Sequence, residues 1–187
     1  SAMSIPVRHT VGSLAAIVGG VLFTAASALG QSADGLFVTV PNPITTEGVN
    51  RIKAIVGTRI DPAAPQRAGT VVFDFNPDGK PAATADFGAC LSLQDYILNT
   101  VNRNGVNTVA FVHAPTSAHT VLPVLACREL VMSPGATLGQ VTDDGNPPLV
   151  PPLNASKETL YRETLAAVGR GGLVPVVRKM YDPAVQL

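Results

Sequence analysis

The chain has 187 residues and a formal net charge of zero, with 13 Lys and Arg balanced by 13 Asp and Glu. This length suits one domain with a buried core. The balanced charge excludes the basic stripe with which proteins hold a nucleic-acid backbone, so no nucleic-acid partner is expected.

The first thirty residues, 1–30, differ from the rest of the chain. Ser1 and Ala2 stand ahead of the first methionine, as an expression-vector remnant would. Residues 11–29 carry no charge, Arg8 precedes them, and an A-x-A pattern (ASA) lies near their end. This arrangement predicts a secretory signal peptide. The alternative is an uncleaved membrane anchor, because the run almost reaches spanning length. Both predict an exported, periplasmic or membrane-anchored protein.

The first elements after this leader alternate between strand and helix. LFVTV at 36–40 is rich in β-forming residues, and TVVFDF at 70–75 is a second short strand. Between them ITTEGVNRIKAIV, at 44–56, has apolar residues on one helical face. Thr45 or Thr46 can cap this helix.

The same alternation continues to the end of the chain. We expect a helix at 91–105, a nearly continuous apolar strand at 107–113, a strand at 129–133, a helix from Ser156 and a last helix at 173–182. This order predicts an α/β fold, with βαβ units on a mostly parallel sheet flanked by helices.

Two turns carry residues that could take part in catalysis or ligand binding. Ligands of parallel sheets bind at the carboxyl ends of the strands. The turns NPDG (76–79) and HAPTSAH (113–119) each follow a strand, so they face one crevice if those strands are neighbours. Ser117 is expected to open a short helix, either as a nucleophile or as its N-cap.

Three stretches resemble one known family: ITTEGVNRIKAIV, LACRELVMSPGATLG (125–139) and GRGGLVPVVRKMYDP. They are similar to the ClpP/crotonase-like serine peptidases of the SppA and NfeD type. The resemblance covers 36–187, is most specific at 125–139, and implies a ClpP/crotonase-like fold. It also implies homo-oligomers, a peptide or membrane-protein substrate and no cofactor. The chain stops at AVQL, which fits a truncated domain or the edge of a further one.

The family's chemistry maps onto four residues. A serine attacks the peptide carbonyl, a lysine accepts its proton, and backbone N–H groups hold the oxyanion. The resemblance assigns the nucleophile to Ser117, the base to Lys157 and the oxyanion hole to Gly79 and Ala118. Such a lysine has to be desolvated, so that its pKa falls toward neutrality.

The departures from the family pattern fall on this site. Asp78 replaces a glycine of the oxyanion turn, and His119 stands where the family has another glycine. Counting back from LACREL without a gap puts Ala118, not Ser117, at the nucleophile position. Along the sequence, Lys157 lies closer to Gly169 and Arg170 than the family's base lies to the corresponding Gly-Arg motif. The alternative is therefore a catalytically inactive ClpP-like domain used for assembly or for binding peptides. A crotonase-like acyl-CoA enzyme is a third, less favoured hypothesis.

The remaining His and Cys residues predict little chemistry. His119 is a poor base for Ser117, because residues two apart on a helix point to different faces. His113, at a strand end, is expected to be packed or hydrogen-bonded. Cys90 and Cys127 could pair in an oxidising compartment, but their apolar neighbours favour buried free thiols. The sequence contains no Cys/His cluster of the kind that binds a metal, so no metal site is predicted.

Overall fold

The computed structural model describes residues 35–142, 153–182 and 184–187. The predicted leader, residues 1–30, lies outside these ranges, and so does most of the proline-rich loop, 143–152. Across the described ranges, no helix combines the length and the apolar character that crossing a bilayer requires.

The main sheet has four parallel strands in the order β1-β2-β4-β6. Their bounds are Gly35–Val40 for β1, Thr70–Phe75 for β2, Asn107–Val112 for β4 and Glu129–Met132 for β6. All four strands were predicted from the sequence, and their parallel pairing confirms an α/β fold with βαβ units. β2 and β4 are neighbours, so the two turns that follow them lie at the same edge of the sheet.

A second, smaller sheet pairs β3 (Ala82–Thr84) with β5 (Thr116–Ala118) in parallel. The sequence pattern predicts a loop over PAATADFGA (81–89), which holds the first segment, and the start of a helix at the second. Both predictions were wrong, because these strands of three residues each are stabilised by pairing with each other across a long sequence separation.

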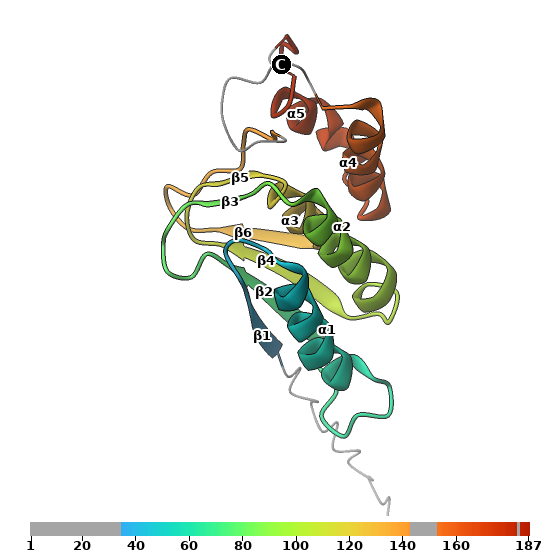
Figure 1. The fold of residues 1–187 in the computed structure, drawn as a ribbon. Helices are drawn as coiled ribbons and strands as arrows, with labels where there is room; N and C mark the ends of the chain where they lie inside the picture. Colours follow the sequence, from blue (N-terminus) through green and yellow to red (C-terminus); the bar gives the residue numbers. More distant parts are fainter. Residues whose placement is uncertain (1–34, 143–152, 183) are drawn as a thin grey trace, which may run out of the picture. The chain divides into compact units, whose positions relative to one another are not determined.

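The described residues form five α-helices, of which α1 and α2 cover one face of the main sheet, whereas α4 and α5 lie beyond it, next to α3 (Figure 1). Their bounds are Thr46–Ile60 for α1, Phe87–Tyr96 for α2, Val121–Ala126 for α3, Ala155–Ala167 for α4 and Val174–Lys179 for α5. A π-helical turn, Ile97–Val101, prolongs α2, and a 3-10 turn, Gly171–Leu173, precedes α5.

Side-chain caps explain where two of the helices begin. The Thr45 hydroxyl accepts a hydrogen bond from the Gly48 N–H at 3.1 Å, which confirms Thr45 as a cap of α1. The carboxylate of Asp86 accepts one from the Ala89 N–H at 3.0 Å. Because Asp86 caps α2, that helix begins at Phe87, four residues earlier than the apolar pattern predicted.

The core lies between one face of the main sheet and helices α1 and α2. Alternate strand residues, such as Val38, Phe73 and Ala110, are buried against Ile52 and Leu93 of these helices. A second buried cluster joins α3, α4 and α5 through Leu122, Tyr161, Leu165 and Val177, among others. Aliphatic burial of this extent is the main favourable contribution to folding.

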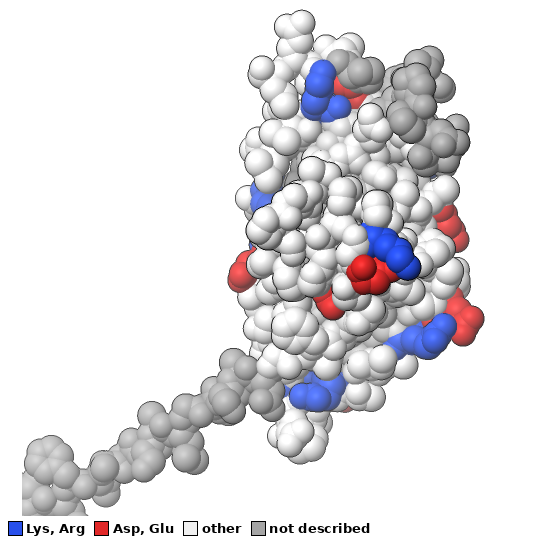
Figure 2. Space-filling model, turned by 90° about the vertical axis from the view of Figure 1, so that its left-hand side faces the viewer, with Lys and Arg blue, Asp and Glu red and all other residues white. Residues whose placement is uncertain are grey.

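The opposite face of the main sheet is less covered. Phe37 of β1 is 67% exposed and Val131 of β6 is 47% exposed. The strand register places both on this face. Parallel sheets usually have both faces covered. On the side of the molecule shown in Figure 2, charged side chains are sparse and the two signs lie close together, so that side carries no basic patch.

Two glycines of α1 give a test of this packing. A Cβ added at Gly48 would lie 2.4 Å from Cγ of Pro41, whereas one at Gly57 would lie 3.8 Å from the Tyr96 hydroxyl, an ordinary contact. We expect Gly48→Ala to lower the free energy of unfolding by about 1–3 kcal/mol. Gly57→Ala should raise it by about 0.5–1 kcal/mol, through helix propensity. Urea denaturation measures both, and equal effects of the two substitutions would contradict the packing.

Candidate functional site

A buried asparagine joins the two turns at the carboxyl ends of β2 and β4. Asn76 is 2% exposed and its backbone is left-handed, with φ of +47°. Its side-chain amide donates to the Ala114 carbonyl at 3.1 Å and to the Thr116 hydroxyl at 3.4 Å. Its side-chain oxygen accepts a hydrogen bond from the His113 N–H at 3.1 Å. The two predicted turns therefore form one unit.

The chain beyond this unit builds the wall of a pocket. The Thr116 N–H donates to the Thr137 carbonyl at 2.8 Å, and the Gly139 N–H donates to the Thr116 carbonyl at 3.1 Å. Residues 137–139 thus run beside β5, on the side away from β3. A pocket of about 310 Å³ lies here, lined by Pro115, Thr116, Ser117, Thr137, Leu138, Gly139 and Gln140.

Ser117 lies in this pocket on strand β5, and it does not begin a helix. It is half-buried, and its hydroxyl lies 3.5 Å from the Ala82 carbonyl, at the limit of hydrogen bonding. The first helix after it, α3, begins only at Val121. Ser117 is therefore not the N-cap that the sequence offered as its structural role.

The two residues predicted to form the oxyanion hole already use their N–H groups. The Ala118 N–H donates to the Gln140 carbonyl at 2.8 Å, and the Gly79 N–H donates to the Asn76 carbonyl at 3.0 Å. Gly79 is exposed in its turn, with φ of +72°, whereas Ala118 is fully buried. The Gly79 N–H thus closes the NPDG turn, and the Ala118 N–H joins β5 to the chain at Gln140.

Lys157 lies in the first turn of α4, where its backbone N–H donates to the Asn154 side chain at 3.0 Å. Its ammonium nitrogen is 4.9 Å from the centroid of the Phe87 ring, within the range of a cation–π interaction. The side chain is partly buried. The structure thus places Lys157 against an aromatic ring of α2, while Ser117 lines the pocket beside 137–140.

His119 is buried among aromatic rings. It is 0% exposed, and its Nδ1 lies 3.3 Å from the Tyr161 hydroxyl. The edge-to-face contact with Phe87 has ring centroids 4.9 Å apart. The backbone N–H of His119 donates to the Thr84 carbonyl at 3.0 Å. These contacts connect β3, α2 and α4 at the residue that replaces a family glycine, which indicates a packing role for His119.

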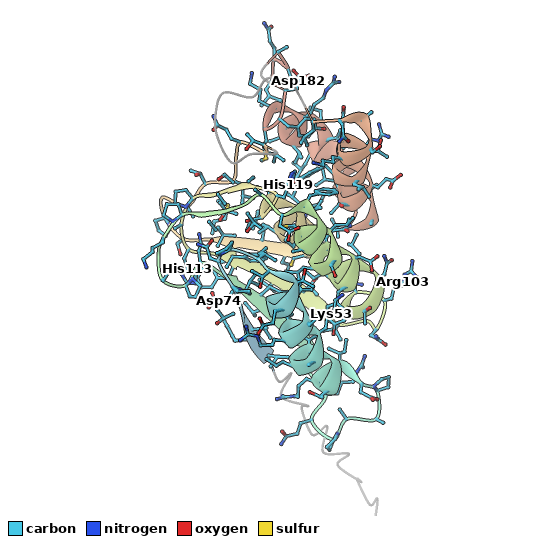
Figure 3. All side chains as sticks on the ribbon, in the orientation of Figure 1. Lys53, Asp74, Arg103, His113, His119 and Asp182 are labelled. Carbon is cyan, nitrogen blue, oxygen red and sulfur yellow. The ribbon has the colours of Figure 1, made fainter. Side chains whose placement is uncertain are left out.

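The sequence reasoning missed a His–carboxylate pair at the same edge of the sheet. His113 Nε2 lies 2.6 Å from Asp74 Oδ1, and both side chains are partly exposed (Figure 3). The ring of Phe111 packs on that of His113, with centroids 4.1 Å apart. This confirms His113 as a packed, hydrogen-bonded residue. Its partner could have been found from the alternation of TVVFDF, which turns Asp74 away from the core.

Both cysteines are buried free thiols, as predicted. Burial, with a smaller contribution from the Asp86 carboxylate, raises the pKa of Cys90 to about 12. Burial also raises the pKa of Cys127, partly offset by Arg170. A thiol with so high a pKa is protonated at neutral pH and is a poor nucleophile. The described segments hold no group of three or more His, Cys, Asp or Glu residues that could bind a metal ion.

No family model, curated protein or solved structure matches this chain. The class of protein is therefore defined by the fold alone: an α/β domain with a parallel sheet and flanking helices.

The backbone at Ala118 gives a test of the site's geometry. Its φ of +50° is left-handed, which costs a non-glycine residue about 1–2 kcal/mol. Ala110 is equally buried but lies within strand β4. Ala110→Gly should lower the free energy of unfolding by about 1–2 kcal/mol. Ala118→Gly should be close to neutral, because relief of the strain offsets the lost methyl group. Equal losses in urea denaturation would show that Ala118 is not strained.

Proposed function

We propose that this chain is a non-catalytic α/β domain of the ClpP/SppA/NfeD type, retained for assembly and for binding peptide or protein segments. The observation that carries the proposal is the state of the predicted oxyanion donors. The N–H groups of Ala118 and Gly79 both donate to backbone carbonyls. An oxyanion hole needs donors aimed at the site where negative charge develops, and using these two would break bonds that hold β5 and the NPDG turn.

The surroundings of Ser117 support the same conclusion. A serine hydroxyl needs a neighbouring base before it can attack a carbonyl. The described residues that line its pocket are uncharged, and none is His, Lys, Asp or Glu. The Lys157 ammonium lies instead over the Phe87 ring.

The residues that resemble the family line the pocket wall, whereas the departures from the family lie at the predicted catalytic positions. This pattern fits a domain that has lost catalysis and kept a binding surface. Leu138 and Gly139, in the wall of the pocket, belong to the stretch that is most similar to the family. The departures fall on Asp78, Ala118 and His119, where the chemistry would occur. His119 in particular fills its position with a buried ring.

A serine peptidase with a Ser117–Lys157 dyad is the competing hypothesis. The observation that favours it is the half-buried hydroxyl of Ser117, which lines a pocket at the edge where ligands of parallel sheets bind. An exported or membrane-anchored location, and peptide or membrane-protein partners, are predictions common to both hypotheses. The location depends on residues 1–30, which lie outside the described ranges.

Labelling with a fluorophosphonate probe separates the two hypotheses. The full-length wild type is compared with Ser117→Ala and with Ser133→Ala, a matched control that removes a half-buried hydroxyl just after β6. A known serine hydrolase in the same experiment shows that the probe is active. We expect no labelling of any of the three proteins, because the described residues that line the pocket of Ser117 include no base.

Two outcomes would overturn the proposal. Labelling of the wild type and Ser133→Ala, but not of Ser117→Ala, would establish Ser117 as a nucleophile. In that case Lys157→Arg, which keeps a cation over Phe87 but cannot act as a base at neutral pH, should abolish labelling if Lys157 is the base. Labelling of all three proteins would place a reactive nucleophile elsewhere in the chain.

A further inference from the structure

Strand β1 ends the main sheet and presents an unusual edge. It pairs with β2 on one side, and no other strand among the described residues pairs with its outer side. Its sequence, GLFVTV, contains neither a charged residue nor a proline. Native proteins usually protect edge strands with charges, prolines, bulges or covering elements, because an open edge is a template for another strand.

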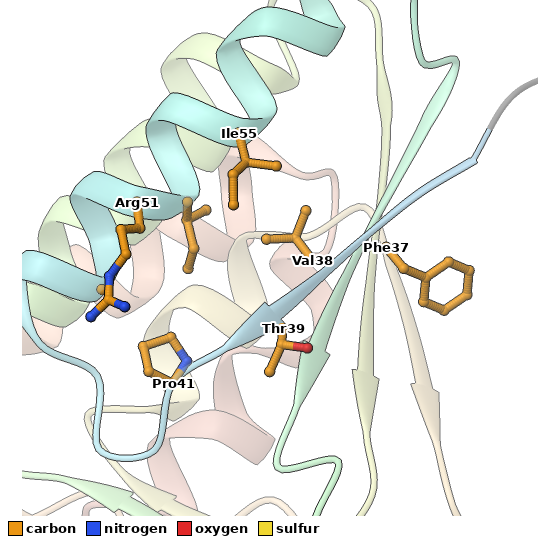
Figure 4. A pocket seen from close by; sticks show the side chains of 8 residues that line it. Phe37, Val38, Thr39, Pro41, Arg51 and Ile55 are labelled. Atoms are coloured by element: carbon orange, nitrogen blue, oxygen red, sulfur yellow. The ribbon is translucent and has the colours of Figure 1, made fainter.

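A groove runs along this edge, between β1 and α1 (Figure 4). Its volume is about 390 Å³, and its apolar lining includes Val38, Pro41, Ile52 and Ile55. Ile55 is 52% exposed in the groove, and Phe37 is 67% exposed on the other side of the strand. Both faces of the edge therefore carry a large apolar side chain in contact with water.

We propose that two copies of this chain associate through their β1 edges, with the strands antiparallel about a twofold axis, to form one continuous sheet. This inference stands on the β1 edge and does not depend on whether the domain is catalytic. An added strand would satisfy the outward-facing N–H and C=O groups of β1. It would also bury Phe37 and Ile55 on the two faces of the joined sheet.

The alternation of side chains limits the register of such a pair. Residues opposite each other on antiparallel strands point to the same face. Phe37 points away from α1, whereas Val38 is buried beneath it. Phe37 can therefore lie opposite Phe37 or Thr39 of the second copy, but not opposite Val38. Either register leaves the helices of both copies on one face of the joined sheet.

The charges beside the groove favour a second copy over an unrelated peptide. Glu47 and Arg51 lie one turn apart on α1, form a 3.1 Å ion pair, and have side chains that are 81% and 72% exposed, respectively. A twofold axis would bring the two α1 helices side by side and antiparallel. Glu47 of one copy can then pair with Arg51 of the other. Because each copy contributes one negative and one positive charge, the two surfaces are complementary and do not repel each other.

Analytical ultracentrifugation of the full-length protein, from about 1 to 500 µM, tests this interface. We expect the wild type to form dimers. Phe37→Lys places a charge at the β1 edge and should raise the dimer dissociation constant by about tenfold or more. Val131→Lys makes the matched change at the exposed β6 edge and should leave the dimer intact. Far-UV circular dichroism confirms that each variant is folded.

Charge reversal gives a second test of the proposed dimer interface. Glu47→Arg should weaken the dimer, and Glu47→Arg combined with Arg51→Glu should restore it, because the double variant regains complementary charges. A wild type that stays monomeric throughout would overturn the proposal. So would a dimer that is insensitive to Phe37→Lys, or one that Val131→Lys disrupts.

Discussion

The side-chain amide of Asn76 is buried where β2 and β4 end, and it bonds three polar groups of the neighbouring turn. Two of those groups also bond each other, since the Thr116 hydroxyl donates to the Ala114 carbonyl at 3.2 Å, so Asn76 completes a hydrogen-bond network within the turn. Asparagine also tolerates the left-handed backbone found at this position better than most residues do. The two turns are therefore fixed relative to each other, and the rest of the candidate site follows from their position.

With the turns joined, the chain after His113 runs beside β3 as strand β5, and the pocket wall at 137–139 lies against its other side. Ser117 is thereby held on a strand within a pocket. The left-handed backbone of Ala118 then turns the chain toward α3. The same ladder occupies the Ala118 N–H. The contacts that build the pocket thus use a donor that catalysis would need, which is why we favour binding over hydrolysis.

Much of the fold could be predicted because its signals are local. The short β-forming run TVVFDF and the nearly continuous apolar run NTVAFV predicted β2 and β4, and a cap at Thr45 or Thr46 predicted the start of α1. The site was harder to predict. SAHT before an apolar run suggested a helix headed by Ser117, but pairing with β3 and the bond from the Thr84 N–H to the Thr120 hydroxyl keep this stretch extended. The Asp74–His113 pair also depends on the adjacency of two strands.

Hydrogen exchange of the full-length protein tests most directly whether Asn76 holds the site together. Asn76→Asp keeps the shape of the side chain and an acceptor for the His113 N–H, but removes the donors to Ala114 and Thr116. Asn104→Asp makes the same change at an exposed asparagine. The account predicts that amides at 113–118 exchange at least about tenfold faster in Asn76→Asp alone, while those of α1 keep their protection. Unchanged exchange at 113–118, or an equal effect in the control, would contradict it.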